Sequence, residues 1–367
     1  MKKMNYGIII PIFIFFIISI ISIYSTSINS SNILSRQVIY YIIGFCIIIL
    51  FQKIDTKNTF KYIIFFYILG NILLLLLLFF GEEINGSKCW FVIPKVGSFQ
   101  PSEFMKLILI IMNANIFEMY DRKNEKRSIK TDVKLFFTIM IITLIPSILT
   151  FLEPDTGAII IYFLISFVML FSFGIKNIIF IVIIVISAIL LAAFFYFYFN
   201  YQTKFIDIFG TSFFYRIDRI LDWSNKSGMQ LTNALASIKA AHLFGFGIGK
   251  TPIYIPERHT DFIFSIYASN TGLIGVIVLI VTIAIFDVCI LIKANELYVK
   301  KYKFVIIGFF AMLLYQQIQN IGMNIGLLPI TGITLPFISY GGSSLLCYMT
   351  GIGIILGLDK AKKSTKG

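Results

Sequence analysis

Apolar runs recur along the whole chain of 367 residues, and they restrict the possible fold more than any other feature. Each run is roughly 20 residues long, which is the helical length that crosses a hydrocarbon core of ~30 Å. The composition agrees, because 58% of the residues are hydrophobic and only 13% are charged. The sequence therefore predicts an all-α polytopic membrane protein whose helices pack as a single domain, residues 1–367.

The apolar runs divide the chain into ten expected membrane helices. The second, sixth and tenth are short, so they are expected to extend into their flanks or to cross where the bilayer is thin. One long polar segment, residues 200–260, separates the seventh helix from the eighth. The expected ranges are 7–27, 34–52, 62–80, 104–120, 135–152, 158–173, 178–199, 262–286, 304–321 and 343–357.

The net charge of +13 would suggest nucleic-acid binding in a soluble protein. Here the basic residues lie between apolar runs, so they indicate topology, and no nucleic acid is expected. With the N-terminus in the cytoplasm, 20 of the 31 Lys and Arg residues lie inside and 11 outside. Seven of those 11 lie in the segment 200–260. Basic residues in long loops have little influence on membrane orientation, because the positive-inside rule applies to short loops. The pattern predicts cytoplasmic termini and a long external loop, which in a bacterium faces the cell wall.

Polar residues gather on the predicted outer side, first in CWFVIPKVGSFQPSEFMKL, residues 89–107. Glu103 falls in the first turn of the fourth helix, where the helix dipole favours a negative charge. Lys106 lies three residues further on, on the same face. An N-terminal cap with a local ion pair would explain Glu103. A cation one turn inside the membrane needs an anionic partner, and a substrate phosphate would serve.

The motif EPDTGA, residues 153–158, places two carboxylates in a short hairpin between the fifth and sixth helices. Asp155 can cap the sixth helix, which is the structural interpretation. Two carboxylates, Glu153 and Asp155, in a hairpin that must approach the bilayer also suit a functional site, since ionisable groups at membrane depth are costly.

The segment GLLPITGITLPFISYGGSS, residues 326–344, contains two prolines and four glycines, which disfavour a continuous helix. Irregular backbone at membrane depth must be buried in protein or line a wet cavity. The segment is therefore expected to form a re-entrant cap on the bundle, to line a substrate cavity with Ser339, Ser343 and Ser344, or to do both.

The long outer segment carries Arg216 and Arg219, which are three residues apart and can share one helix face. They could hold a diphosphate through charge-assisted hydrogen bonds, or equally pair with Asp218 and Asp222. The glycine-rich run GFGIG, residues 245–249, follows no expected strand, so a phosphate-binding loop is discounted.

The stretch PERHTDFIFS places Asp261 where the long segment enters the eighth helix. The structural interpretation is an N-cap, which Thr260 and Asp261 suit well. The functional interpretation is glycosyl transfer from a lipid diphosphate sugar. In that reaction cations stabilise the leaving group, the acceptor hydroxyl needs one general base, and a carboxylate can be that base.

Together the motifs W…SFQPSEFMKL, EPDTGA, PERHTDFIF and LPITGITLPFISYGGSS resemble the SEDS family, the RodA, FtsW and SpoVE proteins. The resemblance covers nearly the whole chain. It implies a peptidoglycan glycosyltransferase that polymerises lipid II, the undecaprenyl-diphosphate disaccharide-pentapeptide, with Asp261 as the essential aspartate. The motif residues and the basic residues that could hold the diphosphate together form the candidate substrate-binding set. Its members are Trp90, Glu103, Lys106, Glu153, Asp155, Arg216, Arg219, Arg258, Ser339 and Ser343.

The resemblance also implies a class B penicillin-binding protein as partner, and the chain length looks more like RodA than like a long-tailed division protein. One departure stands out, because Ala268-Ser269-Asn270 replaces the Gly-Glu-Glu that the family usually carries. The missing carboxylates leave open whether a divalent cation, Mg²⁺ or Mn²⁺, binds, and no other cofactor is expected. Two other functions stay open: a lipid II flippase, and an inactive scaffold for the penicillin-binding protein.

Overall fold

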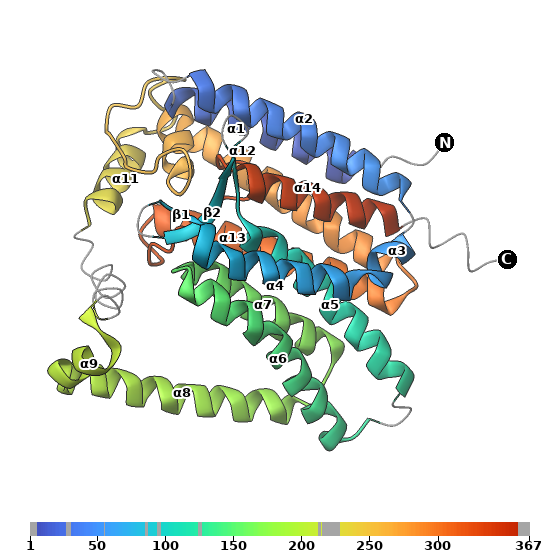
Figure 1. The fold of residues 1–367 in the computed structure, drawn as a ribbon. Coiled ribbons are helices and arrows are strands. Elements are labelled where there is room, and N and C mark those ends of the chain that lie inside the picture. Colours follow the sequence, from blue (N-terminus) through green and yellow to red (C-terminus); the bar gives the residue numbers. More distant parts are fainter. Residues whose placement is uncertain are drawn as a thin grey trace.

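The computed structural model describes residues 6–26, 31–54, 56–84, 87–93, 97–123, 127–211, 214 and 228–358. Within them the chain forms a bundle of long helices (Figure 1). Every one of the ten predicted spans is a helix, and the short second span extends into its flanks as expected. These helices are α1 (Tyr6–Thr26), α2 (Ser31–Lys53), α4 (Ile63–Phe80), α5 (Pro101–Lys123), α6 (Ile129–Leu152), α7 (Thr156–Phe173), α8 (Asn177–Asn200), α12 (Ile263–Asn295), α13 (Lys300–Asn324) and α14 (Gly342–Gly357).

Eight of these helices are long and apolar enough to cross a membrane, which makes the protein an all-helical multi-span membrane protein. The other two are α14, which has 16 residues, and α5, which carries charged residues at both ends. Among the described residues, three short helices lie between the spans: α3 (Thr56–Lys61), α9 (Gln202–Phe209) and α11 (Met229–Ala240).

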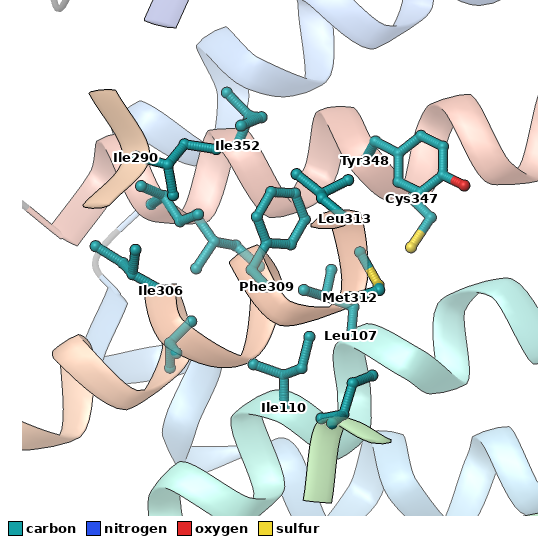
Figure 2. Close-up of a cluster of buried hydrophobic side chains, with 14 of the residues drawn as sticks. Leu107, Ile110, Ile290, Ile306, Phe309, Met312, Leu313, Cys347, Tyr348 and Ile352 are labelled. Atoms are coloured by element: carbon teal, nitrogen blue, oxygen red, sulfur yellow. The ribbon is translucent and has the colours of Figure 1, made fainter. Parts of the chain in front are cut away.

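Helix α13 lies at the centre of the bundle and packs against α5, α7 and α12. Figure 2 shows this core, where Phe309, Met312 and Leu313 lie among apolar side chains of α5, α12 and α14. Packing is close enough that a methyl group on Gly351 of α14 would lie 2.2 Å from the Phe309 ring. Protein interiors pack at crystal-like density, so this contact fixes how α13 and α14 approach each other.

Helix α8 differs from the other spans because it lies apart from the bundle (Figure 1). Of its 24 residues only Ile179 and Tyr198 are buried. Its apolar surface has the composition expected of a helix that faces lipid on nearly all sides.

One end of the bundle carries a small antiparallel sheet, which the prediction of an all-α chain did not include. Its order is β1-β2-β3, with β1 (Glu82–Ile84), β2 (Ser87–Ile93) and β3 (Gly97–Phe99). The register pairs Glu82 with Trp90 and Phe91 with Phe99. Strands of three to seven residues give little periodic signal, so the sequence pattern alone did not reveal them. We call this end of the bundle the sheet end.

The segment 325–341 between α13 and α14 is not a continuous helix, as its prolines and glycines predict. Side chains of α1 and α2 hold its backbone in the bundle. Ser19 donates to the Ile338 carbonyl at 2.8 Å, Tyr41 donates to the Phe337 carbonyl, and Gln37 donates to the Ser339 carbonyl at 3.3 Å. These bonds give carbonyls at membrane depth the partners that water cannot supply there.

Candidate active site

A cavity of about 540 Å³ opens at the sheet end of the bundle. Its walls come from α2, the sheet, the start of α5, the turn between α6 and α7, the residues before α12, and the segment before α14. Segments far apart in the sequence therefore meet around one space. Six predicted site residues line it: Trp90, Glu103, Lys106, Asp155, Asp261 and Ser343.

Asp261 faces the cavity and does not cap a helix. The N-cap position of α12 is Phe262, which makes no side-chain capping bond. Among the described residues, no group donates a hydrogen bond to the Asp261 carboxylate. Burial, and then the nearby charge of Glu257, raise the pKa of Asp261 to about 7. Gly332 lies opposite, and a methyl group there would be 3.7 Å from Asp261 Oδ2.

The backbone of Asp261 is held by two asparagines of α13. The side-chain amides of Asn320 and Asn324 each donate to the Asp261 carbonyl at 2.9 Å. Asn324 Oδ1 in turn accepts from the backbone N–H of Ser265 at 3.1 Å and from its hydroxyl at 2.5 Å. Because the first amides of a helix lack partners within it, Asn324 completes the start of α12 from a neighbouring helix.

Lys106 is the cation at the base of the cavity. Its side chain is only 1% exposed, and its Nζ lies 2.7 Å from Glu103 Oε2. Gln316 of α13 lines the same region. Its Nε2 donates to the Tyr348 hydroxyl at 2.9 Å, whereas its buried Oε1 accepts no hydrogen bond from the described residues. An acceptor without a partner in a cavity wall is available to a ligand hydroxyl or amide.

Asp155 contrasts with Asp261, because its carboxylate is fully engaged. Its Oδ1 accepts from the Ala158 N–H at 3.1 Å, which caps α7 as the sequence allowed. Its Oδ2 accepts from Gln100 and from Ser102, each at 3.0 Å. Asp155 therefore ties the start of α7 to the start of α5 while it lines the cavity.

The remaining predicted residues lie elsewhere. Glu153 is completely buried, and neither carboxylate oxygen has a hydrogen-bond partner among the residues that the structure describes. Burial, and then the charge of Asp155, raise the pKa of Glu153 to about 8, so this carboxyl group is mainly protonated at neutral pH. Arg216 and Arg219 fall outside the described residues.

Ser339 and Arg258 hold the loop that carries Asp261, and neither lines the cavity. The Ser339 hydroxyl donates to the Thr260 carbonyl at 2.6 Å. Arg258 donates to the Thr26 carbonyl at 2.8 Å, and its guanidinium lies 5.5 Å from the centre of the Tyr254 ring. Ser343 does line the cavity, where its hydroxyl accepts from the Gln100 N–H at 2.9 Å.

Sequence reasoning missed the amides of α13. Gln316, Asn320 and Asn324 are four residues apart, so they share one helix face. That spacing within a membrane helix was the available signal, because polar side chains at membrane depth need partners.

Within the described part of the chain, no three His, Cys, Asp or Glu side chains are grouped so that they could hold a metal ion. At the positions of the expected glutamates, Ser269 and Asn270 are buried, and their side-chain polar atoms have no hydrogen-bond partner in the described part of the chain.

The family model FTSW_RODA_SPOVE, described as a cell cycle protein, matches residues 4–364. The chain belongs to this family. A relative named "Probable peptidoglycan glycosyltransferase FtsW" from Wigglesworthia glossinidia brevipalpis is 33% identical over 88% of this chain and 83% of its own length. A protein of the same name from Haemophilus influenzae is 30% identical over 94% of this chain and 88% of its own length.

Solved structures of family members share the fold. A chain of the structure titled "Structural coordination of polymerization and crosslinking by a peptidoglycan synthase complex" matches with a TM-score of 0.83 and 25% identity, over 99% of both chains. The rod shape determining protein RodA of Thermus thermophilus matches with a TM-score of 0.70 and 24% identity, over 99% of this chain and 98% of RodA. The relatives carry the name FtsW and this structure the name RodA, so the comparisons identify the family and not one of its branches.

The hydrogen bonds that Asn324 accepts from Ser265 predict that removing the Asn324 side chain lowers the stability of the protein. Asn324→Ala leaves the buried Ser265 N–H and hydroxyl without their acceptor, which should cost about 1–3 kcal/mol. Thermal unfolding in detergent measures it as a lower apparent Tm. The matched control is Gln319→Ala, because Gln319 is an amide of the same helix that makes a single bond, to the Pro329 carbonyl at 2.8 Å. Equal losses of Tm in both variants would contradict the bridging role.

Proposed function

We propose that this chain is a peptidoglycan glycosyltransferase that polymerises lipid II, with Asp261 as its general base. The observation that carries the proposal is a carboxylate with a pKa near 7 and no hydrogen-bond donor among the described residues, facing a cavity that also contains a buried lysine. Membership in a family whose curated relatives are named probable peptidoglycan glycosyltransferases supports it.

The geometry suits a displacement at the anomeric carbon of a lipid diphosphate sugar. The acceptor hydroxyl forms the new glycosidic bond, the bond to the diphosphate oxygen breaks, and Asp261 takes the hydroxyl proton. A pKa of about 7 matches a base that works at neutral pH. The Lys106 ammonium stabilises the diphosphate anion as it leaves, and Glu103 holds that ammonium in place.

The cavity volume fits this substrate class. Ligand sites typically measure ~300–1,000 Å³, so a cavity of about 540 Å³ can receive sugar and phosphate groups but not a polyprenyl tail. The lipid tail would then lie along the apolar surfaces of the spans. A polar cavity joined to a lipid-facing exterior also suits the lipid II flippase, which makes transport a necessary second assay.

The first test is Asp261→Asn, which keeps the side-chain size but removes the base. Polymerisation of lipid II by the purified protein together with a class B penicillin-binding protein, its expected transpeptidase partner, should fall by a factor of ~10² to 10⁴. Gel separation of the glycan chains measures it, and the apparent Tm should stay near that of the wild type. Asp207→Asn on the exposed face of α9 is the control and should keep full activity.

Each other outcome of that assay points to a different function. An active Asp261→Asn variant would exclude the general base. A wild-type protein that forms no polymer but moves lipid II across vesicle membranes would be a flippase. A wild-type protein that does neither, yet binds the transpeptidase, would be a scaffold.

The second test is the pH dependence of polymerisation. Asp261 acts only when ionised, so kcat/KM should rise with pH through about 7 and level off above it. Because the charge of Glu257 helps to raise the pKa of Asp261, Glu257→Gln should move the midpoint to lower pH. Initial rates at constant ionic strength measure both profiles. A rate that is flat across neutral pH would exclude Asp261 as the titrating base.

We further propose that the sheet end faces the cell wall and that both termini lie in the cytoplasm. Basic residues mark the opposite end of the bundle. They include the last turns of α2, α5 and α12 and the start of α13, at Lys53, Lys123, Lys293 and Lys300. Cytoplasmic ends of membrane helices are enriched in Lys and Arg.

Cysteine labelling tests this orientation. In a background without native cysteines, Met229→Cys at the start of α11 should react with an impermeant thiol reagent in intact cells. Tyr298→Cys, at the opposite end between α12 and α13, should react only after lysis. Both side chains are well exposed, at 62% and 83%. Labelling of Tyr298→Cys in intact cells would reverse the orientation.

We also propose a class B penicillin-binding protein as partner. The support is the likeness, over 99% of this chain, to a member of the solved peptidoglycan synthase complex, whose title names polymerisation and crosslinking together.

A further inference from the structure

Helix α12 is broken at Gly272, about a third of the way along its length. Gly272 has φ 64° and ψ −162°, a backbone conformation that residues with side chains rarely adopt. A break of this kind leaves carbonyls of the preceding turn and amides of the following turn without helical partners. Near a membrane those groups need partners from the protein itself.

The glycine-rich segment 241–250, which we call the strap, supplies those partners with its own backbone. On one side of the break, the N–H groups of Phe246 and Gly247 donate to the carbonyls of residues 269 and 270, at 2.9 and 3.0 Å. On the other side, the N–H groups of residues 273 and 274 donate to the carbonyls of His242 and Leu243, at 3.0 and 3.2 Å.

The contact between strap and helix is close and fixed. A methyl group on Gly245 would lie 2.4 Å from the Asn270 backbone, and one on Gly272 would lie 2.4 Å from the Leu243 carbonyl. Both glycines are therefore required for this approach of two backbones. At its far end, the Gly249 N–H donates to the Ser25 hydroxyl of α1 at 3.0 Å.

The position of the break along α12 places the strap at the membrane surface. From Gly272 to the end of α12 at Asn295 the helix rises about 35 Å, close to the thickness of a hydrocarbon core. Residues 262–270 are buried in the protein. The first large apolar side chains of α12 that are well exposed follow the break directly, at Leu273 and Ile274.

The outer face of the strap is apolar and continues that lipid-facing surface. Leu243, Phe244 and Ile248 are 54%, 76% and 54% exposed, and no charged residue lies among them. Lys250 follows at the end of the strap, where an ammonium suits lipid phosphates at the interface. Exposed aromatic and aliphatic side chains next to a lipid-facing helix are typical of interfacial anchors.

We propose that the strap is a phospholipid anchor, in which Leu243, Phe244 and Ile248 insert at the boundary between head groups and acyl chains. The anchor fixes the depth of the break in α12. It thereby fixes the first segment of α12, which follows Asp261 in the chain, relative to the membrane surface. This inference does not depend on the reaction that the protein catalyses.

Spin-label accessibility tests the anchor directly. In a background without native cysteines, a nitroxide is attached at Phe244→Cys, and the full chain is placed in nanodiscs of mixed zwitterionic and anionic phospholipid. Collision with lipid-soluble oxygen should exceed collision with a water-soluble nickel chelate several-fold, as for a label at the lipid-facing Ile277. A label at Tyr298, which is 83% exposed, is the control and should show the opposite ratio.

Two outcomes would overturn the proposal. The first is a Phe244 label that collides with the nickel chelate as freely as the Tyr298 label does. The second is a Phe244 label that becomes shielded only when a class B penicillin-binding protein is added, because the patch would then be a protein-docking surface. A label at Ile248→Cys repeats the measurement, so that a local disturbance at Phe244 cannot decide the result.

Discussion

The need to give every backbone polar group a partner inside the bundle governs this structure. A continuous membrane helix meets that need by itself, whereas irregular backbone at membrane depth needs partners from the surrounding protein. The chain interrupts its helices near the sheet end, at Gly272 and over residues 325–341, and supplies those partners from elsewhere. Backbone groups of the strap serve the first break. Side chains of α1 and α2 serve the second, and there Tyr41 and Ser19 bond consecutive carbonyls. The second break lines the cavity, through residues such as Gly332 and Tyr340.

The same cavity shows how environment separates the roles of similar carboxylates. Asp155 accepts three hydrogen bonds and joins two helix starts, so its charge is already committed to the structure. Glu153 is buried with no hydrogen-bond partner for its carboxyl group among the described residues, and its raised pKa keeps it mainly uncharged at neutral pH. Asp261 has its backbone fixed by Asn320 and Asn324, while its carboxylate accepts no bond from the described residues. A side chain with a rigid backbone and an unengaged carboxylate is suited to take a proton from a substrate.

Much of the fold and of the candidate site is predictable from the sequence, and the features that are not predictable have physical causes. The spans follow from apolar length, and the motifs around Asp261 and Lys106 are sufficient to assign both residues to one site. Whether Ser339 contacts substrate or a neighbouring carbonyl depends on how two distant segments meet, which local sequence does not encode. The N-cap that the sequence also allowed at Asp261 does not form, for a related reason. Asn324 of another helix serves the start of α12, so the aspartate is not needed there.

The residues that depart from the usual Gly-Glu-Glu, Ala268-Ser269-Asn270, lie in the first segment of α12. Ser269 and Asn270 occupy the last turn before the break in α12, and their carbonyls accept the strap's N–H groups. Those bonds use only the backbone, so they form whatever side chains stand at these positions. Asp261 is held by different groups, the asparagines of α13 and the Ser339 bond to Thr260. The replacement of two carboxylates therefore removes charge from a buried turn while it leaves intact the frame that positions the proposed base.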